Sequence, residues 1–510
     1  MNSLLNGLKN ATNFTLTENG AVTHVTTRSD LLDMFAMGAA YRTRTDEDVI
    51  LMFRKAFAEN PVYALKCLFY IRDVRGGQGE RRFFRVAMKD LATQNPEAAK
   101  RNLKHIPEFG RWDDLYVFVG TPLEADAFAF IKEQLALDIQ CKTPSLLAKW
   151  LKSENTSSAS SRTLANMTRR YLGMTHKQYR KTLSILRERI NVLERLMSAG
   201  KWDEIEFDKI PSRAGMIYKN AFARHDIERM KSDKTVVSYE DFAKDTTTKV
   251  NAKALYPYEC VAEAVKEAGC DHWNYYARHT PSDVNRAMIN KYWDNLADYF
   301  NGAKLNALAV VDTSGSMTGS EATAPINVAI SLGMYCAERA GGPFAGHYIS
   351  FASRPQLIKV EGIDFVDKVE RIYRTNLVDN TNIEAVFDLL LNTAIQNQCT
   401  QDDLPQNILI ISDMEFDSAT GSYRSGWTKA RAETLLESIA HKWTAHGYQM
   451  PHLIFWNVQA RQNNIPMLGQ GRISYVSGMS PSIFETIITG KTGYDLMMAK
   501  LDSARYECIG

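Results

Sequence analysis

Hydrophobic and polar positions alternate in two different ways along this 510-residue chain. Residues 1–30 are polar and Thr-rich without a helical apolar stripe, so we expect them to be extended. From Ser29 onward, apolar residues recur at helical spacing for more than two hundred residues. The pattern predicts helices at 31–36, 46–57, 62–72, 80–93, 96–103, 111–119, 123–138, 144–152, 162–171, 175–197, 211–231 and 258–268. No strand-like alternation interrupts this run, and the element order favours a HEAT-like solenoid of helix pairs.

The pattern changes near residue 304, where short apolar runs begin to alternate with helical segments. We predict strands at 305–311, 344–351, 356–360, 407–412, 452–456 and 473–476, and helices at 324–339, 381–394, 429–445 and 494–504. Such alternation is typical of a mostly parallel, Rossmann-like sheet covered by helices on both faces. The predicted division is an extended segment at 1–29, a helical-repeat module at 30–300 and an α/β domain at 301–510.

Composition adds limits on the class of protein. The chain is long enough for two or three domains, and 45% of its residues are hydrophobic and 24% charged, as in folded proteins. It has no apolar stretch of twenty residues, and its first ten residues are too polar for a signal peptide. Seven scattered cysteines without CxxC pairing indicate reduced thiols. We therefore expect a cytoplasmic protein without a membrane partner.

The net charge of +2 conceals an asymmetry along the chain. Residues 142–235 hold 20 Lys and Arg against 10 Asp and Glu, a net charge of +10. Residues 301–510 hold 16 against 21, a net charge of −5. A basic middle and an acidic end suggest two binding surfaces with different preferences, although charge also fluctuates along chains without function.

The strongest candidate for chemistry is the motif Asp312-Thr-Ser-Gly-Ser316, directly after the strand that ends at Val311. A second acid, Asp413, follows the strand 407–412, and Thr381 opens a predicted helix. Ligands of an open parallel sheet bind outside the carboxyl ends of its strands, where these residues lie. Carboxylates and hydroxyls are oxygen ligands for Mg²⁺, or for Ca²⁺ or Mn²⁺. We predict one divalent cation held by Asp312, Ser314, Ser316, Thr381 and Asp413, with a position open to an anionic ligand; the alternative is an Asp helix cap beside two loop serines.

Two groups of basic residues are candidates for binding phosphates. One surrounds the turn Gly76-Gly-Gln-Gly79, which lacks the Gly-Lys-Ser/Thr of a nucleotide-binding P-loop. The other is interleaved with Tyr171 and Tyr179, as suits RNA, whose bases stack on aromatic rings. The predicted RNA-binding residues are Arg72, Arg75, Arg81, Arg82 and Arg85 in the first group, and Lys149, Arg162, Arg169, Arg170, Lys177, Arg180, Lys181 and Arg187 in the second. The competing interpretation of both is a solvated helix surface or turn.

Two resemblances to known families follow from these motifs. The order Asp-x-Ser-x-Ser, then Thr, then Asp resembles the metal-ion-dependent adhesion site (MIDAS) of von Willebrand factor A domains. The segments Phe69–Phe84, Pro107–Asp114, Ala148–Trp150, Tyr179–Arg187 and Ile210–Arg213 resemble the helical-repeat (TROVE-type) module of uncharacterised Ro autoantigen-like proteins. This likeness implies an all-α helical ring joined to a von Willebrand A domain. It also implies binding of small non-coding or misfolded RNA, as in a ribonucleoprotein.

Signatures of catalysis are missing from the sequence. It has no G-x-S-x-G, no H-E-x-x-H and no catalytic cysteine motif, and a metal held largely by hydroxyls activates water poorly. Cys260, Cys270, His272 and His279 do not have the spacing of a common zinc site. We expect a binding protein, not an enzyme. Its alternative form is an adaptor whose metal site recruits an acidic protein partner without nucleic acid.

Overall fold

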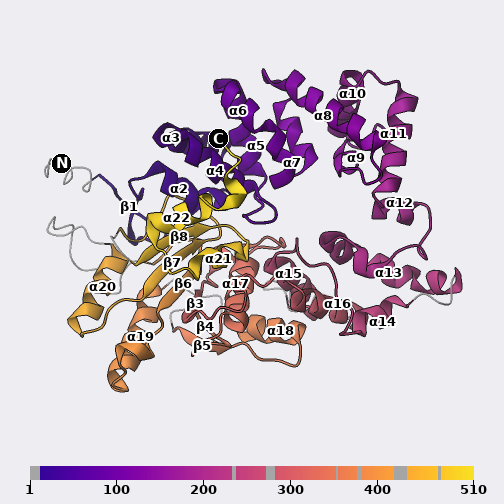
Figure 1. The fold of residues 1–510 in the computed structure, drawn as a ribbon. Helices are drawn as coiled ribbons and strands as arrows, with labels where there is room; N and C mark the ends of the chain where they lie inside the picture. The colour runs from indigo at the N-terminus through magenta and orange to yellow at the C-terminus, as the bar shows by residue number, and fades with distance from the viewer. Residues whose placement is uncertain are drawn as a thin grey trace. The chain divides into compact units, whose positions relative to one another are not determined.

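The computed structural model describes residues 12–232, 237–270, 282–351, 354–375, 382–417, 434–468 and 472–510. The chain divides into two compact units, and both are discontinuous in sequence (Figure 1). We call one the α/β unit, which combines the chain up to Cys67 with Leu255–Ala504, and the other the helical unit, which combines Leu68–Ala254 with Arg505–Gly510. The domain boundaries predicted at residues 29/30 and 300/301 follow the order of elements along the chain. They remain a prediction.

The helical unit consists of helices joined by short loops, and its described residues contain no strand. Helix α4 (Pro61–Arg72) carries the chain into this unit. The helices that follow are α5 (Arg82–Gln94), α6 (Pro96–Asn102), α7 (Ile106–Phe109), α8 (Glu124–Gln140), α9 (Leu147–Trp150), α10 (Ala159–Tyr171), α11 (His176–Arg189), α12 (Leu193–Ser198), α13 (Ser212–Ser232) and α14 (Tyr239–Lys244). The predicted helical character of this part of the chain is confirmed.

Local sequence explains where several of these helices begin and end. Thr175 caps α11 by accepting a hydrogen bond from the amide of Gln178, whose side chain accepts one from the Thr175 amide. The helix ends at Arg189, because Asn191 adopts a left-handed conformation with φ of 48°. The single helix predicted at 175–197 is therefore two helices, α11 and α12. The segment predicted as a helix at 111–119 is a 3₁₀ helix, η3 (Trp112–Phe118).

The α/β unit contains a six-stranded sheet. Its strands are β3 (Ala307–Val311), β4 (His347–Ser350), β5 (Gln356–Lys359), β6 (Asn407–Ser412), β7 (His452–Asn457) and β8 (Ile473–Ser477), in the order β5-β4-β3-β6-β7-β8. All neighbours are parallel except β4 and β5, which are antiparallel. Strands β3, β6, β7 and β8 are buried almost throughout, as expected of parallel strands covered on both faces. The predicted mostly parallel sheet is confirmed.

Helices and a small hairpin complete the α/β unit. The helices are α2 (Asp30–Met37), α3 (Asp46–Glu59), α15 (Pro257–Ala268), α16 (Asp283–Asp294), α17 (Pro325–Arg339), α18 (Phe365–Thr375), α19 (Ile383–Gln396), α20 (Leu435–Ala445), α21 (Phe484–Ile487) and α22 (Gly493–Leu501). Strands β1 (Phe14–Leu16) and β2 (Val22–His24) form an antiparallel hairpin within the segment predicted to be extended. Helices α16 and α18 were not predicted, although Phe365, Val366, Val369, Ile372 and Tyr373 are buried at helical spacing.

The central strands are held in place by close packing on α17. This helix contacts β3, β4 and β6, and a Cβ atom on its Gly333 would lie only 2.4 Å from Cγ2 of Val311. Glycine is therefore required for the helix to approach the strand that ends beside Asp312. Helix α2 packs over β7 and β8. None of the helices that the structure describes is long and apolar enough to cross a membrane.

Candidate functional site

The loop after β3 places Asp312 at the carboxyl edge of the sheet, fully buried. The register of β3 and β6 sets Val311 opposite Ile411, so Asp312 lies next to Ser412 on the neighbouring strand. The Ser412 hydroxyl donates a 2.5 Å hydrogen bond to Oδ2 of Asp312. Backbone hydrogen bonds from Asp312 to Ile411 and from Phe351 to Val311 fix this loop to the strands on both sides.

The predicted hydroxyl ligands lie around this carboxylate. The Ser314 amide donates to Oδ1 of Asp312 at 2.9 Å, and the hydroxyls of Ser314 and Ser316 lie 3.0 Å apart. The Ser314 side chain is buried, whereas Ser316 is half-buried. The structure therefore brings together Asp312, Ser314 and Ser316 as the sequence predicted, and adds a third hydroxyl, that of Ser412.

The loop after β6 contributes two further buried acids, Asp413 and Glu415, each 1% exposed. The two are two residues apart, and the Glu415 amide donates to Oδ1 of Asp413 at 3.2 Å. Between them, Met414 adopts a left-handed conformation with φ of 67°, and its amide is bonded to the Ser412 hydroxyl at 2.9 Å. This turn holds the carboxylate of Asp413 within electrostatic range of Asp312.

The N-terminal hairpin and the loop after β7 cover this acidic group. The guanidinium of Arg461 donates to Oδ2 of Asp413 at 2.9 Å and to Glu18 at 2.8 Å. The Glu18 amide and the Asn464 side chain donate to the two carboxylate oxygens of Glu415, at 2.7 and 2.8 Å. An open hollow of about 480 Å³ beside Arg461 is lined by Thr43, Arg44, Thr45, Asp48 and residues 461–463.

Burial and mutual repulsion shape the protonation of these acids. Burial, followed by the negative charge of Asp413, raises the pKa of Asp312 to about 7. Burial also raises the pKa of Glu415 to about 7, against the hydrogen bond from the Glu18 amide. Arg461 pairs with Asp413 and with the exposed Glu18, whereas the buried carboxylates of Asp312 and Glu415 make no ion pair among the described residues.

One predicted ligand of the cation site cannot be placed. Thr381 lies outside the described residues. In the part of the chain that the structure describes, no three His, Cys, Asp or Glu side chains are grouped as they would be around a metal ion. The predicted ligand set differs from such a group, because only two of its members are carboxylates and the others are hydroxyls. His272 and His279 also lie outside the described residues.

Several of the arginines predicted to bind RNA are engaged inside the helical unit. Arg72 is 1% exposed and donates to Asp114 at 2.8 and 2.7 Å. The Arg187 guanidinium donates to the carbonyls of Ala148 and Leu151 and to the Ser153 hydroxyl. These two side chains tie elements of the fold together, so we assign them a structural role. Arg169 pairs with Glu154, and Arg162 donates to the carbonyls of Thr156 and Ser157.

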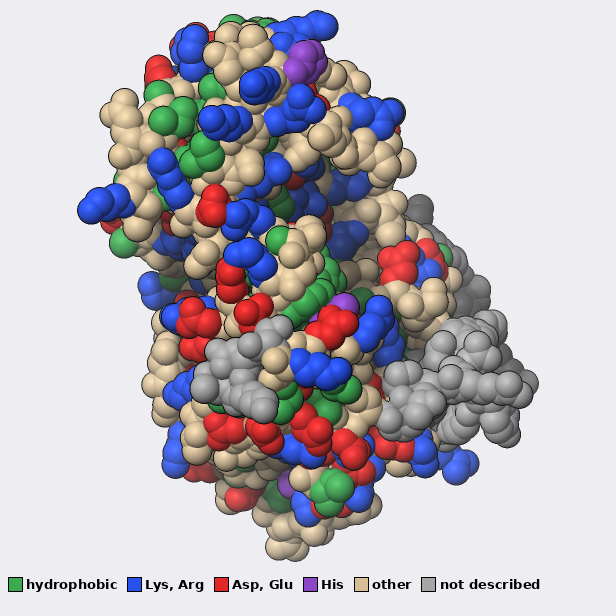
Figure 2. All heavy atoms as spheres, turned by 90° about the vertical axis from the view of Figure 1, so that its right-hand side faces the viewer, with side chains coloured by type: hydrophobic (Ala, Val, Ile, Leu, Met, Phe, Trp, Pro, Cys, Tyr) green, Lys and Arg blue, Asp and Glu red, His purple; other side chains and the backbone are tan. Residues whose placement is uncertain are grey.

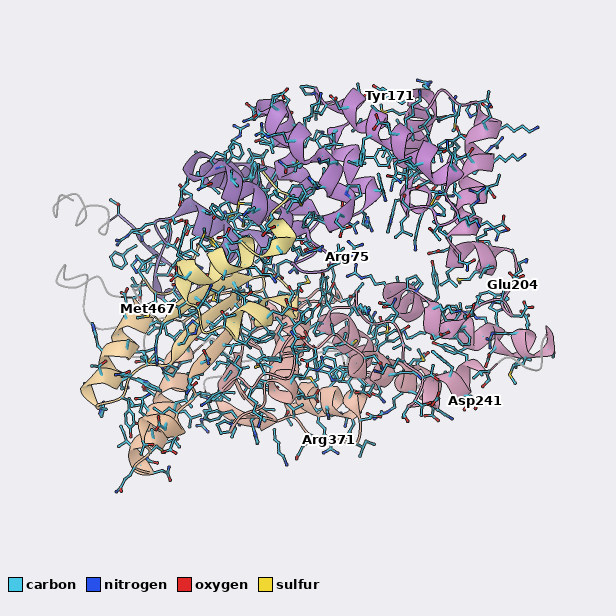
Figure 3. All side chains as sticks on the ribbon, viewed as in Figure 1. Arg75, Tyr171, Glu204, Asp241, Arg371 and Met467 are labelled. Carbon is cyan, nitrogen blue, oxygen red and sulfur yellow. The ribbon has the colours of Figure 1, made fainter. Side chains whose placement is uncertain are left out.

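Other predicted residues remain at the surface. Arg170, Lys177, Arg180 and Lys181 are exposed and make no ion pair among the described residues. The last three occupy one face of α11, at spacings of three and four residues. Figure 2 shows many Lys and Arg side chains over the part of the helical unit formed by α10–α12. Tyr171, labelled in Figure 3, stacks on Phe128 with 4.3 Å between ring centroids, whereas Tyr179 is buried.

The arginines around the glycine-rich turn after α4 lie in different environments. Arg75, also labelled in Figure 3, is exposed and lies 3.6 Å from Glu108. Arg85 donates to Asp114 at 2.7 Å, while Arg82 is half-buried and Arg81 is exposed. Lys149 is half-buried, with its ammonium 5.8 Å from the ring centre of Trp150.

The fold and site define an α/β unit with a buried acid–hydroxyl group, combined in one chain with a helical unit. The chain belongs to the family of a domain of unknown function, DUF2828, whose model matches residues 17–138 and 136–302, more than half of the chain. A second domain of unknown function, DUF7788, matches residues 306–504. The chain is also similar to the uncharacterized protein L728 of Acanthamoeba polyphaga mimivirus, with 29% identity over 519 residues that cover 94% of this chain and 85% of that protein.

Proposed function

We propose that this protein is a binding protein whose α/β unit, of the von Willebrand A type, docks a ligand through one divalent cation. The observation that carries the proposal is the buried Asp312 carboxylate, with the hydroxyls of Ser314, Ser316 and Ser412 around it and Asp413 beside it. Mg²⁺ is the first candidate, with Ca²⁺ or Mn²⁺ as alternatives, because oxygen-only ligand sets suit these ions. Thr381 completes the proposed ligand set, and the docked partner supplies an anionic oxygen.

A cation fits this group for an electrostatic reason. Buried carboxylates that lack a counter-charge are costly, and Asp312 and Glu415 make no ion pair among the described residues, since Arg461 pairs with Asp413 and the exposed Glu18. A bound divalent cation would supply the missing positive charge and let Asp312 and Asp413 remain ionised together. The chain's own residues would hold and orient the ion, and an acidic protein partner is the simplest ligand for it.

Calorimetric titration of Mg²⁺ into the full chain tests the proposal. We expect Asp312→Asn to abolish binding, because it removes a charged ligand without changing the shape of the side chain. Asp402→Asn is the matched control, since Asp402 is an exposed acid of the same unit. Equal titrations for the wild type and Asp312→Asn would refute the cation site.

RNA binding by the helical unit is a second proposed function, as in the Ro-like proteins that the sequence resembles. The exposed cations of α11, Lys177, Arg180 and Lys181, favour it, because they have no carboxylate partner among the described residues. The ligand would be a small structured or misfolded RNA bound without catalysis, and the free cysteines agree with a cytoplasmic location. If nucleic acid does not bind, the protein is an adaptor that uses the cation site alone.

Binding of a structured RNA at increasing salt tests this second function. Because each phosphate contact releases counterions, affinity should fall steeply with salt, and converting Lys177, Arg180 and Lys181 to Gln should weaken binding by about tenfold or more. The control converts three exposed lysines elsewhere, Lys55, Lys89 and Lys104, to Gln. Equal losses in the two triple variants would show that only net charge matters, and RNA binding that ignores salt would contradict the proposal.

A further inference from the structure

Arginine side chains from separate segments of the helical unit gather around two buried carboxylates. Arg72 ends α4, Arg85 lies in the first turn of α5, and Arg111 precedes η3. The carboxylates belong to Asp113 and Asp114, whose side chains are 6% and 0% exposed. Two consecutive buried aspartates thus organise cations from distant parts of the sequence.

Both carboxylates are fully engaged. Asp114 accepts hydrogen bonds from Arg72 at 2.8 and 2.7 Å, from Arg85 at 2.7 Å and from the Arg111 amide at 2.9 Å. Asp113 accepts bonds from Arg111 at 2.9 and 3.0 Å, and lies 3.3 Å from both Arg85 and Lys152. All four carboxylate oxygens therefore already have cationic partners.

Arg81 is the cation without a partner in this group. It is exposed, makes no ion pair among the described residues, and lies one helical turn before Arg85, whose amide donates to its carbonyl at 3.0 Å. Although the residue as a whole is exposed, its guanidinium lies close to the protein, and this partial desolvation, followed by repulsion from Arg111, Arg85 and Arg72, lowers the pKa of Arg81 to about 10. With Lys152, five cations face two carboxylates, so the formal excess is 5 − 2 = 3 positive charges.

Packing holds the arginines beside Arg81 in place. The Arg111 guanidinium lies 4.0 Å from the ring centre of Trp150, which supports it from one side. Gly110 passes directly over the ion pairs, because a Cβ atom there would lie 2.4 Å from Oδ2 of Asp114 and 2.9 Å from Nε of Arg72. Arg72, Arg85 and Arg111 cannot move away from one another or from Arg81 without breaking contacts to the buried acids.

We propose that Arg81, together with the edges of Arg85 and Arg111, binds a phosphoryl oxyanion. Guanidinium groups present paired N–H donors that match two oxygens of a phosphate, and an anion would supply the charge that this cluster lacks. The phosphoryl group comes either from free phosphate or from an RNA backbone. The second source deepens the RNA-binding function proposed above and rests on it, whereas the first does not.

Titration of inorganic phosphate at constant ionic strength, followed by calorimetry and thermal unfolding of the full chain, tests the site. We expect the wild type to bind phosphate and Arg81→Gln to bind it about tenfold more weakly, because charge-assisted hydrogen bonds are lost. In phosphate-free buffer, Arg81→Gln should melt no lower than the wild type, since the substitution removes repulsion. Arg81→Lys, which keeps the charge, should retain part of the affinity, and Arg180→Gln should bind phosphate normally.

A short single-stranded RNA distinguishes the two sources. If the phosphoryl group belongs to RNA, Arg81→Gln should weaken RNA binding and free phosphate should compete with it. If the ligand is free phosphate, RNA binding should be unchanged by Arg81→Gln. Phosphate binding that depends on Arg81 in a protein without RNA affinity would uphold this site and refute the RNA function. A wild-type protein that does not bind phosphate, or an Arg81→Gln variant that binds it equally well, would overturn the inference.

Discussion

The guanidinium of Arg461 donates a 2.9 Å hydrogen bond to Oδ2 of Asp413, the acid that follows β6. Its other terminal nitrogen pairs with Glu18 in the turn of the N-terminal hairpin. Arg461 therefore supplies positive charge at the carboxylate where we propose that a divalent cation binds. The proposed divalent cation would compete with Arg461 for the same oxygen, and Arg461 would then link the hairpin to the cation site.

This competition predicts the effect of removing Arg461. The Arg461→Gln variant should bind Mg²⁺ about tenfold more tightly, because Asp413 gains a free oxygen and loses a nearby positive charge. Glu18→Gln is the control, since it removes the second ion pair and leaves Arg461 on Asp413. Calorimetric titration of the three proteins measures the effect. Weaker Mg²⁺ binding by Arg461→Gln would mean that Arg461 supports the site instead of competing for it.

The repulsion between Asp312 and Asp413 predicts that the cation reverses which protein is more stable, the wild type or Asp312→Asn. With a chelator present, Asp312→Asn should be more stable than the wild type by about 1 kcal/mol, because one of two neighbouring buried charges is gone. With saturating Mg²⁺ the order should reverse, since only the wild type gains binding energy. Thermal unfolding under both conditions measures this. If Mg²⁺ raised the melting temperatures of both proteins equally, the assignment of Asp312 as a ligand would be contradicted.

The sequence predicted the parts of the site that depend on neighbouring residues. Asp312, Ser314 and Ser316 lie within one loop after an apolar strand, so the pattern of that strand placed them correctly. Arg461 could not be assigned in this way, because it is 48 residues from Asp413 and 443 from Glu18 along the chain. Its one available signal was its position after β7, at the same edge of the sheet. The break at Asn191 was likewise missed, because neither glycine nor proline marks it.

The buried pair of Arg72 and Asp114 predicts a stability effect where the sequence suggested RNA binding. Replacing Arg72 with Met should lower the free energy of unfolding by about 3–5 kcal/mol, because it leaves a buried carboxylate short of a partner. Replacing the exposed Lys177 with Met should change it by about 0.5 kcal/mol or less. Urea unfolding followed by circular dichroism compares the two variants. Similar midpoints for both would show that the buried pair is not needed for stability.

His452 in β7 gives a prediction for the dependence of stability on pH. Its ring is 5% exposed and lies between the Asn407 side-chain oxygen, 3.0 Å from Nδ1, and the Ser474 hydroxyl, 2.8 Å from Nε2. The Ser474 oxygen also accepts a bond from the Gly493 amide, so its hydroxyl proton is free to point at Nε2. These partners suit a neutral ring protonated at Nδ1. Burial, with the nearby charge of Arg472, lowers the pKa of His452 to about 4.

Because this pKa is below the value of about 6.5 for an exposed histidine, the unfolded chain takes up a proton at a higher pH than the folded protein does. The stabilisation is therefore fully present above pH of about 6.5 and is lost as pH falls toward 4, by roughly 1.4 kcal/mol per pH unit within that window. His452→Gln should lose less stability than the wild type between pH 7 and about 5, as measured by urea unfolding at each pH. Replacing the exposed His446 with Gln should leave the wild-type dependence in place. A wild type and a His452→Gln variant that lose stability in parallel would show that another group controls the acid response.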